Sequence, residues 1–119
     1  MFDSNRRKYP RIYYPCQLMM WLDDGSNETI MANTTNIGIG GLSVTLNQKA
    51  NLGTKVDIQL NFSNPATSFR CKGAVVSCLP GENKIYNTGI RFEPLDEIKA
   101  VFLERKISEL LRLTQKGNN

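Results

Sequence analysis

The feature that most constrains the fold is a series of short segments in which β-favouring residues lie between turn-forming residues. The clearest segment is 56–62, where apolar and polar residues alternate without interruption, and 42–46 has the same alternation. A period of two gives a strand with one face in a core and the other in water. The chain is therefore expected to consist mainly of half-buried strands.

Four further segments predict strands, namely 16–22, 28–37, 69–78 and 86–92. The segments 23–27 (Asp-Asp-Gly-Ser-Asn) and 80–83 (Pro-Gly-Glu-Asn) that separate some of them have strong turn chemistry. Closing a sheet removes its exposed edges. Six short strands at fairly regular spacing therefore predict a closed or nearly closed antiparallel β-barrel.

After residue 95 the apolar spacing changes to three and four, which predicts an amphipathic helix over residues 96–114. Asp96 is expected to cap its start, and Gly117 to lie just past its end. An apolar stripe must be buried, so the helix is expected to close one mouth of the barrel. The alternative is that part of the stripe contacts a partner protein. The apolar positions are Ile98, Val101, Phe102, Leu103, Ile107, Leu110, Leu111 and Leu113.

The length of 119 residues fits one domain. We expect a flexible basic N-terminal arm over residues 1–14, a barrel over 15–95 and the helix over 96–114. Neither an export signal nor an apolar run long enough to span a membrane is present, which predicts a cytoplasmic protein without membrane insertion. Cys16, Cys71 and Cys78 lack the spacing of a metal knuckle or redox motif and are expected to be reduced, buried thiols.

The sequence contains no histidine. This removes the commonest general base, the commonest transition-metal ligand and every nucleophile activated by histidine. We therefore expect a protein that is not an enzyme and that has neither a metal site nor a cofactor.

The net charge of +4 comes from one short segment, because Arg6, Arg7, Lys8 and Arg11 account for the excess of 15 basic over 11 acidic residues. A face that binds a nucleic acid polymer needs basic residues spread along a groove. The clustering instead predicts a focused anion site and no nucleic acid partner.

The second candidate binding element is the turn from Asn36 to Gly41, which holds three glycines in four positions. Glycines let a backbone approach closely, here at Gly40 and Gly41, and the Asn36 amide can both donate to and accept from a base edge. A guanidinium matches phosphate oxygens and the O6 and N7 acceptors of guanine. Arg7 and Arg11 can therefore hold two groups of one ligand.

Together these elements resemble the PilZ domain family. Arg7 and Arg11 resemble its RxxxR motif, Asn36 and Gly41 its (D/N)xSxxG motif, and residues 86–92 its late strand. The resemblance covers residues 6–114. It implies a six-stranded antiparallel barrel of the split-barrel type with a C-terminal helix, which binds cyclic di-GMP on its outer face.

Residue by residue, the resemblance implies that Arg7 and Arg11 grip phosphates and guanine edges and that Asn36 contacts a guanine. Gly41 keeps the turn tight and Arg6 adds a further contact, while Gly38 and Gly40 complete the ligand-binding set. Gly38 replaces the serine of the family, so one hydroxyl is absent. A neutral hydrogen bond contributes about 0.5–1.5 kcal/mol and a charged one about 1.5–3 kcal/mol, so the arginines are expected to dominate binding.

Three functions remain open at this point. The first is a receptor that relays the level of cyclic di-GMP to an unidentified downstream protein, in control of motility, biofilm or exopolysaccharide. The second is a PilZ-like adaptor that has lost nucleotide binding, which the glycine at position 38 favours. The third is an oligonucleotide-binding barrel, with Trp21, Tyr13, Tyr14 and Tyr86 as stacking groups. The balanced charge outside the arm and the expected core position of Trp21 oppose the third.

Overall fold

The structure is a computed structural model that describes residues 11–13, 16–25, 28–63 and 66–117, with the backbone alone for 11–13 and 113–117. It confirms the six predicted strands and adds a short strand before them. The strands are β1 (Arg11–Tyr13), β2 (Gln17–Leu22), β3 (Ile30–Gly38), β4 (Gly41–Leu46), β5 (Lys55–Phe62), β6 (Thr67–Pro80) and β7 (Tyr86–Phe92). A single 3-10 turn, η1 (Glu82–Lys84), links β6 to β7, and helix α2 (Glu97–Gly117) follows.

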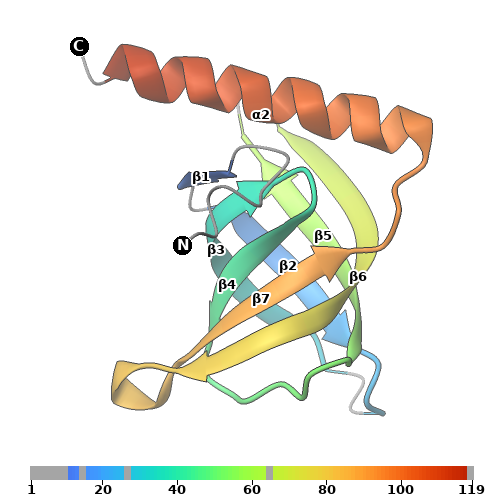
Figure 1. Ribbon diagram of the computed structural model, residues 1–119, viewed down its shortest axis with the longest axis vertical. Coiled ribbons are helices and arrows are strands. Elements are labelled where there is room, and N and C mark those ends of the chain that lie inside the picture. Colours follow the sequence, from blue (N-terminus) through green and yellow to red (C-terminus); the bar gives the residue numbers. More distant parts are fainter. Residues whose placement is uncertain (1–10, 14–15, 26–27, 64–65, 118–119) are drawn as a thin grey trace, which may run out of the picture.

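The strands form one antiparallel sheet that closes on itself, as predicted. Its order is β1-β3-β2-β5-β6-β7-β4, and a further pairing of β3 with β4 joins the two ends. Strands β2 to β7 therefore make a six-stranded barrel, and β1 lies on the edge of β3 beyond β2. Figure 1 shows α2 lying across one end of this barrel, with β1 beneath it.

Alternating residues of each strand fill the barrel. In β5, Val56, Ile58, Leu60 and Phe62 are buried, which confirms the alternation seen in the sequence. Helix α2 adds Leu103, Ile107 and Leu110 to the same core. The ring of Phe102 stacks on that of Phe69 at a centroid distance of 5.6 Å. The helix thus covers the mouth at which β5 ends and β6 begins.

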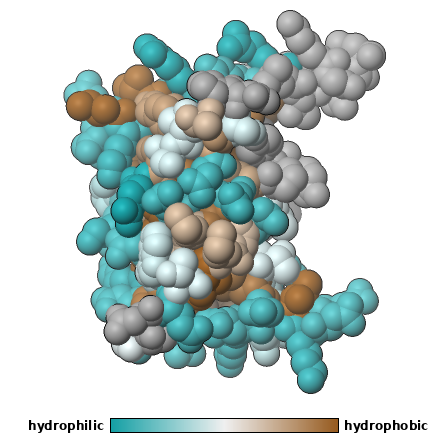
Figure 2. All heavy atoms as spheres, turned by 180° about the vertical axis from the view of Figure 1, so that it is seen from behind, coloured by the Kyte–Doolittle hydropathy of each residue, from teal (hydrophilic) through white to brown (hydrophobic). Residues whose placement is uncertain are grey.

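The start of α2 is as predicted, whereas its end is not. The side chain of Asp96 accepts a hydrogen bond of 2.8 Å from the backbone N–H of Lys99, which confirms the cap. Gly117 is the last helical residue and not the first one beyond the helix. Ile98 and Val101, two of the predicted apolar positions, are 83% and 46% exposed and do not pack on the barrel. Apolar atoms are visible at the upper left of Figure 2, where this end of the helix lies.

The cysteines are free, and Cys16 and Cys71 are buried as predicted, whereas Cys78 is half-buried. Burial raises the pKa of the Cys16 thiol to about 11 and that of Cys71 to about 12, so both stay protonated at neutral pH. Among the described residues, no helix is long and apolar enough to cross a membrane.

The expected core position of Trp21 was wrong. Strand β2 buries Leu18, Met20 and Leu22, so Trp21 points outward and is half-exposed. Its indole N–H donates to the hydroxyl of Thr29 at 2.8 Å.

Candidate functional site

The last residue of the basic segment, Arg11, lies beside the glycine-rich turn at one end of the barrel. Strand β1 pairs with the last residues of β3, and the register joins Arg11 to Gly38 and Tyr13 to Asn36. Strand β1 was predicted as part of a flexible arm. Its three residues pair with β3 on the same edge as β2, just beyond the residues that pair with β2. The C-terminal arginine of the basic segment is therefore beside the glycine-rich turn. Arg6 and Arg7 lie outside the described residues.

A β-bulge determines which way Asn36 faces. Thr34 and Ile37 are both buried although they lie three positions apart, and the register of β3 against β4 shifts between Thr34 and Asn36. A bulge inserts one residue and so reverses the alternation that follows it. Ile37 therefore points into the core, and Asn36 lies on the outer face opposite Ser43.

The side chain of Asn36 contains a buried polar atom that forms no hydrogen bond with the described residues. Its side-chain oxygen Oδ1 is buried and has no hydrogen-bond partner among the described residues. Leaving a buried acceptor unsatisfied costs on the order of 1–3 kcal/mol. Such a group in a native structure calls for an explanation, and a ligand that donates a hydrogen bond is one.

The glycines of the turn have different roles. A Cβ on Gly41 would overlap the backbone carbonyl oxygen of Ile90, so Gly41 is required for the close pairing of β4 with β7. At Gly40 a Cβ would meet no atom of the described residues within 4 Å. The carbonyl oxygen of Gly40 accepts a 2.9 Å hydrogen bond from the N–H of Phe92. Gly38 is buried at the register position next to Arg11. The tight turn expected at Gly41 is thus enforced by the neighbouring strand.

Small residues form the outer surface of the barrel beside the turn. One row across the strands runs from Asn36 through Ser43 and Gly89 to Ser77, each residue paired in register with the next. A side chain on Gly89 would displace the Ser77 hydroxyl, 2.5 Å from the position of its Cβ. We call this outer surface of β3, β4 and β7 the glycine face, with Asn36, Gly38, Gly41, Ser43 and Gly89 as its residues. Apart from Asn36, the side chains of this face are hydrogen atoms and one hydroxymethyl group.

The edge of the glycine face includes Arg91, which sequence reasoning missed. Arg91 pairs in register with Gly41 on β4 and with Ala74 on β6. It is exposed between the inward-facing residues Ile90 and Phe92. The signal in the sequence was a charge within an otherwise uncharged strand, but its position beside Gly41 follows only from the register.

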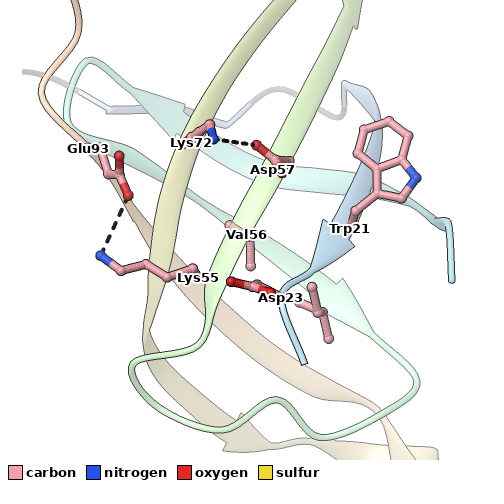
Figure 3. A pocket seen from close by; sticks show the side chains of 8 residues that line it. Trp21, Asp23, Lys55, Val56, Asp57, Lys72 and Glu93 are labelled. Atoms are coloured by element: carbon pink, nitrogen blue, oxygen red, sulfur yellow. Dashed lines mark ion pairs between the residues drawn. The ribbon is translucent and has the colours of Figure 1, made fainter. Parts of the chain in front are cut away.

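The opposite outer surface, on β2, β5 and β6, holds the hollow of about 480 Å³ shown in Figure 3. We call it the tryptophan face, with Trp21, Asp57, Arg70 and Lys72 as its residues. Lys72 Nζ lies 3.8 Å from Asp57 Oδ1, and Lys55 Nζ lies 3.5 Å from Glu93 Oε2. The Arg70 guanidinium lies over the Trp21 ring at 5.3 Å. The charges of this hollow are thus largely paired with one another.

The described residues contain no cluster of histidine, cysteine, aspartate or glutamate that could hold a metal ion. The candidate site combines the amide of Asn36, the hydroxyl of Ser43 and the guanidinium of Arg91 with the small residues of the glycine face. Groups of this kind bind and orient anions and base edges.

Comparison with protein families gives one match, to the PilZ domain, over residues 5–112. The match spans both motifs, the whole barrel and most of α2. The chain belongs to the PilZ domain family. The predicted membership is thereby confirmed.

Solved PilZ structures have the same fold at low sequence identity. The PilZ domain of YcgR from Escherichia coli, solved with c-di-GMP, superposes with a TM-score of 0.77 at 19% identity, over 95% of this chain and 97% of that one. A longer YcgR structure in complex with c-di-GMP gives 0.82 at 20% identity over 95% of this chain. The inhibitor of motility MotI/DgrA from Bacillus subtilis gives 0.72 at 15% identity over 90% of this chain.

This chain spans about half of two of these structures, 49% of the longer YcgR chain and 52% of MotI/DgrA. No curated protein matches its sequence. The comparisons therefore establish the family and the PilZ barrel.

Proposed function

We propose that this PilZ domain is a cytoplasmic receptor for cyclic di-GMP. The observation that carries the proposal is the register of β1 on β3, which joins Arg11 to Gly38 and Tyr13 to Asn36. It supports one site formed by the RxxxR segment and the glycine-rich turn, although they are separated by more than 20 residues of sequence. The YcgR domain of the same fold was solved with this ligand.

In this proposal Arg7 and Arg11 hold phosphates and guanine edges through bidentate, charged hydrogen bonds. The unpartnered Oδ1 of Asn36 accepts a hydrogen bond from a guanine, which supplies N–H donors on its Watson–Crick edge. Gly38 and Gly40 let the ligand approach the turn, and Arg6 adds a further contact. The ligand is a bound signal and not a cofactor, and we assign no catalysis to the domain.

The ligand would neutralise the arm, fold it onto the glycine face and so change the surface offered to a downstream protein. Control of motility, biofilm or exopolysaccharide is the output we propose. A copurified partner whose retention depends on cyclic di-GMP would identify that protein.

Isothermal titration of the chain with cyclic di-GMP tests the receptor directly, with cyclic di-AMP as the matched control for guanine recognition. We expect saturable heat with cyclic di-GMP only. The absence of both heat and NMR shift changes at high micromolar cyclic di-GMP would reject the receptor.

The second candidate is an adaptor that binds its protein partner without nucleotide. Gly38 favours it, because the family serine and its hydroxyl are absent at that position. Capture of the same partner in equal amounts with and without cyclic di-GMP would support the adaptor over the receptor.

A further inference from the structure

The register of the barrel rim connects two arginines that are 80 positions apart in the sequence. Arg11 pairs with Gly38 at the end of β3, and Arg91 pairs with Gly41 at the start of β4. The last register pair of β3 with β4 joins Ile37 to Leu42. Gly38 directly follows Ile37 in the sequence, and Gly41 directly precedes Leu42. The four residues thus occupy one row across β1, β3, β4 and β7.

This row has an arginine at each end and glycines between. Adjacent strands lie about 4.8 Å apart, so the two arginine Cα atoms are separated by about 14 Å. The glycines have no side chain to fill that distance. A molecule that lies over the middle of the row therefore spans the register positions of both arginines.

Arg91 is available for such a contact. Its side chain is exposed, and its two register partners, Gly41 and Ala74, are too small to cover it. No ion pair joins it to a carboxylate of the described chain, whereas Lys55 and Lys72, which line the hollow on the tryptophan face, are both paired. An unpaired guanidinium beside a small-residue floor retains its donors for an anion.

We propose that Arg91 is a further ligand-binding residue, which holds a phosphate or guanine edge of the cyclic dinucleotide from the β7 side of the glycine face. The site then extends from β1 across the two glycines to β7. This inference rests on the proposed function and adds to it a residue that lies in neither sequence motif.

The planar fork of a guanidinium distinguishes this role from simple attraction of charge. A lysine at position 91 keeps the positive charge but not the paired donors. If Arg91 makes a bidentate contact, lysine replaces it only in part. If Arg91 contributes only its positive charge to the electrostatic potential of the surface, lysine replaces it fully.

The test is titration of cyclic di-GMP into the full chain and its variants Arg91→Gln, Arg91→Lys, Arg11→Ala and Arg105→Gln. Arg105 is an exposed arginine on α2 and serves as the matched control. We expect Arg91→Gln to weaken binding about tenfold or more, since charged hydrogen bonds are lost. Arg91→Lys should be intermediate, and Arg105→Gln should bind as the unaltered chain does.

Equal affinities of Arg91→Gln and Arg105→Gln, with binding lost in Arg11→Ala, would overturn the role of Arg91 and leave the receptor intact. Absence of binding in the unaltered chain would overturn both. Thermal melting of each variant checks its folding. If Arg91→Gln does not fold, the Nε–Hε resonance of Arg91 in the unaltered chain decides, because it must shift when the ligand saturates the site.

Discussion

The glycine face and the tryptophan face are two outer surfaces of one barrel, and they are built in opposite ways. The tryptophan face has large side chains, a hollow of about 480 Å³ and charges that pair with each other. The glycine face has small residues, a buried Oδ1 of Asn36 without a described partner and, at its edge, Arg91, which forms no ion pair with the described residues. The hollow is thus on one face and the unpaired polar groups are on the other.

The difference shows that depth alone does not identify a binding surface. A charged ligand on the tryptophan face must replace ion pairs that the protein already makes, such as that of Lys72 with Asp57. On the glycine face it satisfies groups that have no partner in the described chain. Desolvation of a polar group costs free energy unless a new partner replaces water, so the second face gains more from an anionic, flat molecule.

The largest expected effect is that of Arg11→Ala on cyclic di-GMP binding. Two charged hydrogen bonds are lost, and affinity should fall by roughly 100-fold or more. Titration calorimetry measures it, with Lys72→Ala on the tryptophan face and Lys8→Ala in the arm as controls. Equal losses in Arg11→Ala and Lys8→Ala would mean that the arm acts only through its overall charge.

The next effect concerns Asn36→Ala, which separates a binding role from a structural one. Affinity should fall about tenfold because one hydrogen bond to the base is lost. The melting temperature of the ligand-free protein should not fall, since the variant removes a buried acceptor that lacks a described partner. A lower melting temperature with unchanged affinity would instead assign Asn36 to the stability of the bulge.

A smaller effect in the opposite direction is expected for Gly38→Ser. The variant restores the hydroxyl of the family motif, and one neutral hydrogen bond should tighten binding by up to about tenfold. Ala66→Ser, in the exposed turn between β5 and β6, is the control for a hydroxyl added outside the proposed site. If Gly38→Ser weakens binding, the glycine is needed for room at the turn and the comparison with the family serine does not hold.

The smallest effect on binding is expected for Trp21→Ala. Affinity for cyclic di-GMP should be unchanged, whereas the free energy of unfolding should fall by about 0.5–1 kcal/mol or more because the contact with Arg70 is lost. Chemical denaturation and calorimetry measure the two quantities. A loss of affinity in this variant would show that the ligand contacts the tryptophan face.

Local patterns were sufficient for the strands of the barrel and for the cap of the helix. The alternation over residues 56–62 and the turn chemistry on either side depend on near neighbours in the chain, and the structure reproduces both. Strand β2 also alternates in burial, with Leu18, Met20 and Leu22 inside, but its sequence is apolar at every position after Gln17. The sequence of β2 therefore did not indicate which of its faces lies in the core, and the core position expected for Trp21 was wrong.

The site depended on contacts that no local pattern contains. The bulge at β3 reverses an alternation, so a strict period of two from the buried Thr34 would have placed Asn36 inside. The pairing of Arg11 with Gly38 and of Gly41 with Arg91 joins segments far apart in the sequence. The motif residues could be selected from the sequence, but Arg91 becomes a candidate only once the sheet register is known.

Strand β1 touches more than the rim of β3, because α2 also contacts it at the mouth of the barrel. These three residues thus belong to two packing surfaces at once. A ligand that binds Arg11 would therefore contact a strand on which the helix also packs. In the proposed receptor, ligand binding at β1 would therefore also act on the packing of α2.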